Sequence, residues 1–587
     1  MNGREARAPA PAPAAPHDLP DNLQGDASSR PERQPWSGPR RFRALFKKDG
    51  NLEPFRLLRQ DLRNVRQRYL SDWTVFNQLV LASAVYVFFT NILPGITFAS
   101  DLYVLTGKSW GTIEVVLSTG LCGIIFALFS VQPLTILGVT GPFSVLAENI
   151  YSLCVNSFHV DFLPVMAWSL IHAGWMHYLL AVFNAHDWTM RYVTTFSADI
   201  FSLLNSVIYF YKAGLELQRN HDHVSFAAFL YSVIGALGTC LLAVFLSTAL
   251  RWKPLFGRII RMGLSEYAAA ISIVLFIGIP HMGELADLKH ERLVVQTTFR
   301  PSDPERSTFF VEFWKLPVRW VFISIIPGAI ITVLFYFDHE ISSIICTLKR
   351  YGVQKPGGYA WDIALLGTTT ALCGILGIPP ANGLLPQAPL HSESLRYLVV
   401  EEGASDSDAT EMPSPTNLVP RVYEQRYSPF IQAAMIMVFA SPPLQKLLGL
   451  TPTSVLAGLF MFMGYQSLSV NPILPRIFHM LTPPSELPEL PPRVRWLPIH
   501  AYTLSQVILT GVIFGVTLTV AAPAFPVIIV ILVPVRLLVM NHIWNRETLR
   551  WVDGWACREG KPEDEIEIQR SPAAEDIESG PIREKEA

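Results

Sequence analysis

Asp338 lies inside a long apolar run, where an ionisable side chain needs a specific reason to persist. The run covers residues 318–346, and the carboxylate stands in the stretch L-F-Y-F-D-H-E-I-S-S. A carboxylate at the centre of a membrane span costs about 2.5–3.5 kcal/mol, so it persists mainly where it faces a cavity or a partner. Asp338 is therefore either a substrate-site residue or the structural partner of a helix end or an arginine.

Glu340 follows two residues later, but helix geometry separates it from Asp338. Leu334, Asp338 and Ser342 would share one face of a helix, while Glu340 would point about 200° away from Asp338. We therefore expect the role of Glu340 to differ from that of Asp338. The candidates for such a coupling or structural role are Glu340, Glu148 and Asn91. Glu148, like Glu114, can instead pair within the helix bundle.

Two segments combine glycine and proline with apolar residues in a way that interrupts a helix. Residues 136–142 have the sequence I-L-G-V-T-G-P, and residues 375–381 have the related sequence I-L-G-I-P-P-A within a longer stretch, 372–395, of four prolines and three glycines. Backbone broken at membrane depth must line a cavity or be buried in protein, and paired breaks in two halves are typical of inverted-repeat transporters. The pattern therefore predicts a transport site.

Each break is followed by sequence that can restart as a helix, over 143–154 and about 387–400. A helix N-terminus carries unpaired N–H groups and a partial charge of about +0.5, so two that converge suit an anion or a hydroxyl-rich neutral solute. Thr140 and Asn382 could instead only cap their helices. The expected substrate contacts are Thr140, Gly141 and Phe143 on one side, and Asn382 and Gln387 on the other.

The composition is that of a polytopic membrane protein. Of 587 residues, 50% are hydrophobic and only 16% are charged, against about 25% in soluble domains. The formal net charge of −2 suggests no nucleic-acid partner, and no cysteine spacing indicates a metal site. No hydrolase triad, H-E-x-x-H motif or phosphate-binding glycine loop appears in a suitable context, so we expect neither enzymatic activity nor a cofactor.

About fourteen apolar segments are candidates for membrane spans, seven on each side of a polar loop at 281–315. They cover approximately residues 75–98, 112–130, 131–154, 163–184, 196–212, 226–250, 264–280, 318–346, 361–378, 379–400, 427–448, 453–470, 500–520 and 523–544. The fold class expected is thus an all-α membrane protein in which two segments, 131–154 and 379–400, are broken.

Charge in the short loops orients the chain. The basic loops at 251–261, 349–355 and 476–495 fall on the same side as both termini, which indicates that both ends are cytosolic. The acidic loop 401–416 is also expected there as a flexible segment. The expected organisation is a disordered tail with a basic juxtamembrane helix (1–70), a first repeat (71–280), an extracellular loop (281–317), a second repeat (318–552) and a disordered acidic tail (553–587).

The basic juxtamembrane segment contains Arg56, Arg59, Arg63 and Arg66, spaced by three and four residues, so one face of a helix would be basic. Such a helix either lies on anionic lipid or is simply solvated while it orients the first span.

From about Pro54 to Trp551 the chain resembles the bicarbonate transporter superfamily, and within it fungal and plant borate transporters. The motifs that carry this resemblance are Q-P-L-T-I-L-G-V-T-G-P (132–142), F-D-H-E-I-S (337–342), N-G-L-L-P-Q-A-P-L-H-S-E-S-L (382–395) and V-P-V-R (533–536). The resemblance implies a 7+7 inverted repeat, a core domain that moves against a gate domain, a homodimer, and a position for Asp338 beside the substrate. It also implies a multi-pass protein of the plasma membrane, with the vacuolar membrane as the alternative.

Two departures separate the chain from the chloride/bicarbonate exchangers of that superfamily. Those exchangers carry arginine where this chain has Gln387, and some carry lysine where it has Val520 or Ala521. Their large cytosolic N-terminal domain is also absent from the 587 residues. Borate or boric acid is therefore the expected substrate, and the protein is expected to export it. The rate of export should depend on pH, either because protons are transported as well or because Asp338 changes its protonation state. A bicarbonate or other small-anion exchanger is the alternative.

The predicted topology can be tested by labelling. Single cysteines introduced at Ser405 and Ser571 should resist a membrane-impermeant thiol reagent in intact cells and react after permeabilisation, because the basic loops fix the same side for both. Labelling of either position from outside would contradict the predicted orientation.

Overall fold

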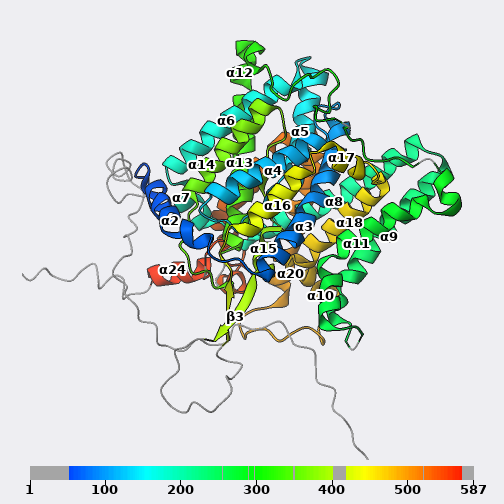
Figure 1. The fold of residues 1–587 in the computed structure, drawn as a ribbon. Helices are drawn as coiled ribbons and strands as arrows, with labels where there is room; N and C mark the ends of the chain where they lie inside the picture. The colour runs from blue at the N-terminus through cyan, green and yellow to red at the C-terminus, as the bar shows by residue number, and fades with distance from the viewer. Residues whose placement is uncertain are drawn as a thin grey trace, which may run out of the picture.

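The computed structural model describes residues 52–570 except 254, 289, 297, 348–350, 386, 401–417, 520 and 559. The acidic loop 401–416 and the tail from 571 onward therefore lie outside the described residues. The described chain is a bundle of helices with four short strands (Figure 1).

The first half contains, in chain order, α2 (Arg56–Asp72), α3 (Gln78–Leu105), α4 (Thr112–Phe129), β1 (Leu137–Gly138), α5 (Gly141–Ser152), η1 (Leu153–Ser157), α6 (Phe162–Val182), α7 (Ala185–Thr189), α8 (Thr195–His223), α9 (Phe226–Ser247), α10 (Arg258–Glu266) and α11 (Ala268–Gly278).

The second half contains α12 (Val318–Ile323), α13 (Ile325–Ile345), α14 (Ala360–Leu376), β2 (Asn382–Gly383), α15 (Gln387–Ser394), β3 (Arg396–Val400), β4 (Leu418–Val422), α16 (Tyr427–Val438), α17 (Pro442–Leu448), α18 (Thr453–Ser469), α19 (Ile473–Leu481), α20 (Trp496–Thr517), α21 (Phe525–Pro534), η10 (Val535–Met540), α22 (Asn541–Ile543), α23 (Arg546–Val552) and α24 (Pro562–Arg570).

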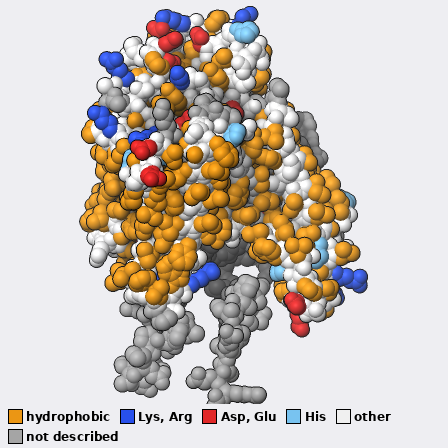
Figure 2. All heavy atoms as spheres, turned by 90° about the vertical axis from the view of Figure 1, so that its right-hand side faces the viewer, with side chains coloured by type: hydrophobic (Ala, Val, Ile, Leu, Met, Phe, Trp, Pro, Cys, Tyr) orange, Lys and Arg blue, Asp and Glu red, His pale blue; other side chains and the backbone are white. Residues whose placement is uncertain are grey.

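Each of the fourteen expected segments coincides with one element or with consecutive elements of this fold. Among the described residues, seven helical segments are long and apolar enough to cross a membrane, and three bent helix pairs pass the same test. Large apolar side chains are exposed along these segments, as on α9, where Phe226, Leu230, Ile234, Leu241 and Phe245 face outward. Figure 2 shows hydrophobic side chains over the middle of one face and charged side chains mainly toward its ends.

Three local expectations are corrected by the structure. The span expected at 196–212 continues as α8 to His223, because its charged residues pair with other helices instead of ending the helix. The second restarted helix ends at Ser394, and residues 396–400 form β3, which pairs antiparallel with β4. The tail after Trp555 is helical over Pro562–Arg570, where Glu563 is buried against Arg536.

The packing of the helices repeats when the first seven segments are exchanged for the last seven. The contact of α6 with α14 corresponds to that of α16 with α4, and the contact of α6 with α13 corresponds to that of α16 with α3. In the same way α9 on α18 corresponds to α20 on α8. This repetition is the pattern of an inverted repeat.

The same contacts divide the molecule into two domains. The core domain contains α3, α4, β1, α5, α6, α13, α14, β2, α15 and α16, and the gate domain contains α8 to α11, α18, α20 and α21. The two domains meet where α5 lies against α8, α13 against α21, and α3 against α18. Small residues allow the closest approach inside the core domain, where a Cβ on Gly367 of α14 would meet the Gly174 carbonyl oxygen of α6 at 2.7 Å.

This close approach predicts a selective cost for one methyl group. Gly367→Ala should lower the stability of the purified protein by about 1–3 kcal/mol, because the added Cβ forces α6 and α14 apart. Gly511→Ala on α20 is the matched control, since no atom lies within 4 Å of its added Cβ. Thermal unfolding in detergent measures both, and equal melting temperatures for the two variants would contradict the packing described.

Candidate functional site

The two broken segments meet in the middle of the core domain as a two-stranded antiparallel pair. Leu137 lies opposite Gly383 and Gly138 opposite Asn382, so each break supplies hydrogen-bond partners to the other. Asn91 of α3 secures the pair, because its Nδ2 donates to the Leu137 carbonyl oxygen at 3.0 Å. A side chain at Gly138 has no room, since a Cβ would meet Asn91 Oδ1 at 2.7 Å.

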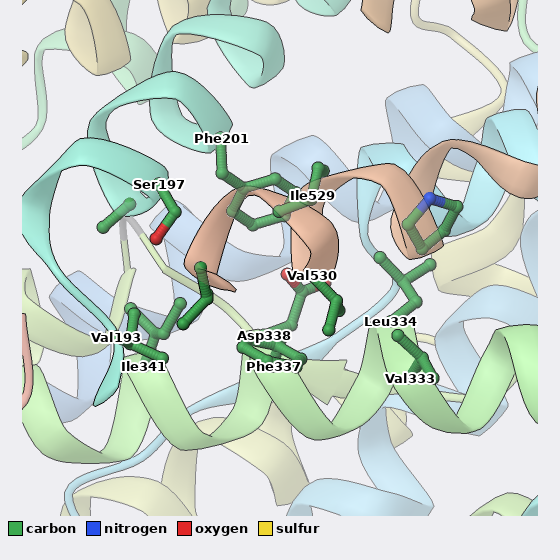
Figure 3. Close-up of a pocket in the computed structure, with 13 residues that line it drawn as sticks. Val193, Ser197, Phe201, Val333, Leu334, Phe337, Asp338, Ile341, Ile529 and Val530 are labelled. Atoms are coloured by element: carbon green, nitrogen blue, oxygen red, sulfur yellow. The ribbon is translucent and has the colours of Figure 1, made fainter. Parts of the chain in front are cut away.

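Asp338 is buried on the face of α13 that turns toward the gate domain. Its Oδ2 accepts a hydrogen bond from Asn382 Nδ2 at 3.4 Å, whereas its Oδ1 has no partner among the described residues. Figure 3 shows Asp338 pointing toward α21, beside Phe201 of α8. The cavity at this position has a volume of about 20 Å³, and Ser197, Phe201 and Ile529 also line it. A cavity of this size holds about one water molecule.

Two further expected site residues also present buried polar atoms without partners in the described structure. Thr140 precedes α5 but makes no side-chain cap, and its Oγ1 is unpaired. Gln387 begins α15; its Nε2 donates to the Thr90 carbonyl oxygen at 3.1 Å, which leaves Oε1 unpaired. Asn382 Oδ1 accepts from the Gly383 N–H at 2.8 Å, within β2. Helix capping thus accounts for neither Thr140 nor Asn382.

The N-terminus of α5 adds backbone donors to this arrangement. Pro142 has no N–H, so Gly141 and Phe143 provide the first-turn donors, which have no acceptor within the helix. The space over Gly141 is bounded by Tyr209, whose Cε1 would lie 3.3 Å from an added Cβ. The Phe143 side chain instead packs against Phe335, with ring centroids 5.5 Å apart, so only its backbone can serve the site.

Glu340 and Glu114 occupy structural positions away from this arrangement. Glu340 points to the other side of α13, as helix geometry predicts, where its Oε2 lies 2.6 Å from His186 Nδ1. Glu114 holds the start of α4, because its Oε2 accepts from the Gly111 N–H at 2.9 Å and from the Ser302 hydroxyl at 2.6 Å.

Glu148 belongs to an ion-pair chain that joins the two domains. Lys212 of α8 bonds to Asp101 of α3 at 2.7 Å and to Glu148 of α5 at 3.1 Å. Arg219, also on α8, bonds to Asp101 at 2.6 Å. Lys212 and Asp101 are both fully buried, so the pairing satisfies charges that would otherwise be costly.

Tyr209, Lys212 and Asp101 are the neighbours of the site that the sequence did not reveal. The apolar run of α8 ends near Lys212. The hydrophobic pattern therefore predicted that Lys212 and the charged residues after it lie at the end of a membrane span. The residues next to such charges in the sequence do not indicate which residues pair with them in the fold. Only the spacing of Lys212, Glu216 and Arg219, which share one side of a helix, could have suggested that α8 continues.

A second, larger cavity lies farther along α8. It has a volume of about 440 Å³ and is lined by residues of α5, α8 and α20, among them Glu148, Asn149 and Lys212. The smaller cavity at Asp338 reaches α8 at Ser197 and Phe201, and the larger one reaches it at Ile208 and Lys212. Both cavities therefore follow the contact between the core and gate domains.

Comparison with known proteins agrees with this architecture. Boron transporter 1 of Saccharomyces cerevisiae is 34% identical to this chain over 84% of each protein. Boron transporter 4 of Arabidopsis thaliana is 25% identical over 89% of this chain and 90% of that protein. Anion exchange protein 2 of Homo sapiens is 24% identical over 85% of this chain, but the match covers only 43% of that protein.

The fold also resembles a solved transporter structure. The transmembrane domain of a cyanobacterium bicarbonate transporter, BicA, superposes with a TM-score of 0.50 at 15% identity, covering 75% of this chain and 98% of that domain. The family model for the HCO3− transporter integral membrane domain matches residues 53–227 and 214–556. The chain therefore belongs to the bicarbonate transporter family and is a multi-pass membrane protein.

Proposed function

We propose that the protein transports boron, as boric acid or borate, out of the cell by alternating access. The observation that carries the proposal is the set of buried, unpaired polar atoms on Asp338, Thr140 and Gln387, which come from the two broken segments and the helix beside them. Buried polar groups are normally paired, so we expect a polar substrate to contact those that lie beside the two breaks and have no partner among the described residues. The names of the yeast and plant relatives support boron as that substrate.

The charge balance favours neutral boric acid in the ground state. The two half-helix N-termini contribute about +0.5 each, which an ionised Asp338 roughly cancels. Asp338 Oδ1 and Gln387 Oε1 are acceptors, and boric acid brings three hydroxyl donors. If Asp338 is protonated, the site becomes positive and suits tetrahydroxyborate instead. Either form makes transport depend on pH, and protons are then the expected coupling partner.

Alternating access is supported by the placement of the cavities. Both lie between the core and gate domains, one beside the first turns of α8 and one beyond its middle. Movement of the core domain along α8 would open the Asp338 region to one cavity at a time. Such movement must break the bonds of Lys212 to Asp101 and Glu148, since these residues lie on opposite sides of the domain contact.

We further infer that the protein works at the plasma membrane as a homodimer with both termini in the cytosol. Figure 1 shows α24 and β3 in the lower part of the molecule, α12 at the opposite end, and α2 on the left side between them. The basic loop before α10 also lies at the lower end, as the distribution of positive charge requires for a cytosolic side. The proposed repeats remain 71–280 and 318–552, with the loop 281–317 outside.

Exchange of bicarbonate or another small anion is the second candidate. It rests on the similarity to anion exchange protein 2 and on the helix N-termini that follow the two breaks, since a helix N-terminus can bind an anion. Gln387 weighs against it, because this position offers an amide and no permanent positive charge.

Asp338→Asn should lower boron transport by about tenfold or more while the protein still folds, because a hydrogen bond to a buried charged group is worth about 1.5–3 kcal/mol. The remaining flux should also lose the part of its pH profile that follows ionisation of Asp338. Boron flux from proteoliposomes over a range of pH measures both effects. Glu340→Gln, the same change on the opposite face of α13, is the control and should keep the wild-type apparent affinity for boron. A wild-type rate and pH profile in Asp338→Asn would assign Asp338 a structural role.

Gln387→Arg should reduce boron transport and favour binding of compact anions, because a guanidinium adds a full charge and bidentate donors to the N-terminus of α15. Gln387→Met separates the two effects, since it removes the amide at similar size without adding charge. Boron and chloride fluxes through the three proteins provide the comparison. If Gln387→Arg moves boron as fast as the wild type, Gln387 does not contact the substrate.

A further inference from the structure

Helix α2 has an exposed face that is both basic and apolar. Arg59, Arg63 and Arg66 are exposed on it, together with Leu62 and Leu70, which are 55% and 78% exposed. At 100° per residue these five side chains fall within an arc of about 100°. None of the three arginines forms an ion pair with a described residue.

The opposite face of the same helix is charged but fully satisfied. Asp61, Arg68 and Asp72 are buried there within an arc of about 40°. Asp61 accepts from the Trp361 N–H at the start of α14 at 3.0 Å, and Arg68 bonds to both Asp72 and Glu424 at 3.2 Å. Asp61 and Asp72 are the only carboxylates of α2, so none is left to neutralise the exposed arginines.

The surroundings of α2 are typical of a helix at a membrane interface. Its C-terminus leads directly toward the first span, α3, and ends at Trp73, whose ring lies 5.0 Å from that of Tyr427 and 6.2 Å from that of Phe430. Phe76, 56% exposed, continues this aromatic group toward α3. Aromatic side chains gather at membrane interfaces, where a helix with leucine and arginine on one face lies along the surface.

We propose that the exposed face of α2 binds the headgroups of anionic phospholipids in the adjacent leaflet. Leu62 and Leu70 would enter the acyl boundary, while Arg59, Arg63 and Arg66 extend to phosphate and carboxylate groups. Guanidinium groups suit this chemistry because they bind such oxygens in pairs. This role goes beyond boron transport and does not depend on the identity of the substrate.

The proposal is tested by quenching at a defined position on α2. A fluorophore is attached to a cysteine at Gln67, which is exposed beside Arg63 and Arg66, after Cys240 and Cys557, the two incompletely buried cysteines, have been replaced by serine. In nanodiscs, spin-labelled phosphatidylserine should quench this fluorophore more strongly than spin-labelled phosphatidylcholine. The preference of α2 for phosphatidylserine over phosphatidylcholine can reach about fivefold for each arginine at the membrane surface.

Replacement of Arg59, Arg63 and Arg66 together by glutamine should bring the two lipids to equal quenching. The matched control replaces three exposed arginines of the opposite end, Arg292, Arg300 and Arg319, by glutamine and should leave the preference intact. The melting temperature of each variant shows whether it is folded.

Two results would overturn the proposal. One is an unchanged phosphatidylserine preference in the folded α2 variant. The other is that both lipids quench the wild-type protein equally, and that quenching by phosphatidylserine becomes stronger only after deletion of 403–413 or truncation after Arg570. That outcome would show that an acidic segment of the chain itself occupies the arginines.

Discussion

Everything in this structure follows from the need to pair polar backbone at membrane depth. Two helices are broken near the middle of the bundle, and water is not available there to satisfy the exposed N–H and C=O groups. The chain solves this by pairing β1 with β2 and by holding β1 with Asn91. Once the breaks are secured, the Gly141 and Phe143 N–H groups of α5 have no hydrogen-bond partner among the described residues, and Asp338 accepts a hydrogen bond from Asn382 on the second break. The same arrangement that stabilises the breaks therefore leaves a polar site between them.

The site lies at the contact of two domains, so movement of one domain against the other would change the surroundings of the site. Asp338 and β2 belong to the core domain, whereas Phe201 and Tyr209, which bound the site, belong to α8 of the gate domain. The buried ion pair of Lys212 with Asp101 crosses the same contact. Such a pair is costly to leave unmade, so it favours the conformation seen here, and any second conformation must provide alternative partners or water for these charges. The ion-pair chain thus sets part of the free-energy difference between conformations.

The sequence predicted what is encoded locally. Asp338, the two breaks and all fourteen segments could be located because hydrophobic runs, proline and glycine act on their immediate surroundings. The sequence could not predict the partners of Lys212 or the continuation of α8, because these depend on residues of other helices, Glu148 of α5 and Asp101 of α3, that are far from α8 in the chain. The helix in the acidic tail was also missed, since burial of Glu563 against Arg536 stabilises it and its own composition suggests disorder. The side chain of Phe143 shows the same limit: its place after the break was correct, but tertiary packing turned it into the core.

We propose that the site formed by the two breaks selects boron over bicarbonate. The most direct measurement reconstitutes the purified protein once and follows boron flux and bicarbonate flux in the same proteoliposomes. We expect a saturable boron flux that bicarbonate neither replaces nor strongly inhibits, because Gln387 offers an amide where a positively charged side chain would favour bicarbonate. A rapid bicarbonate flux with little movement of boron would contradict it.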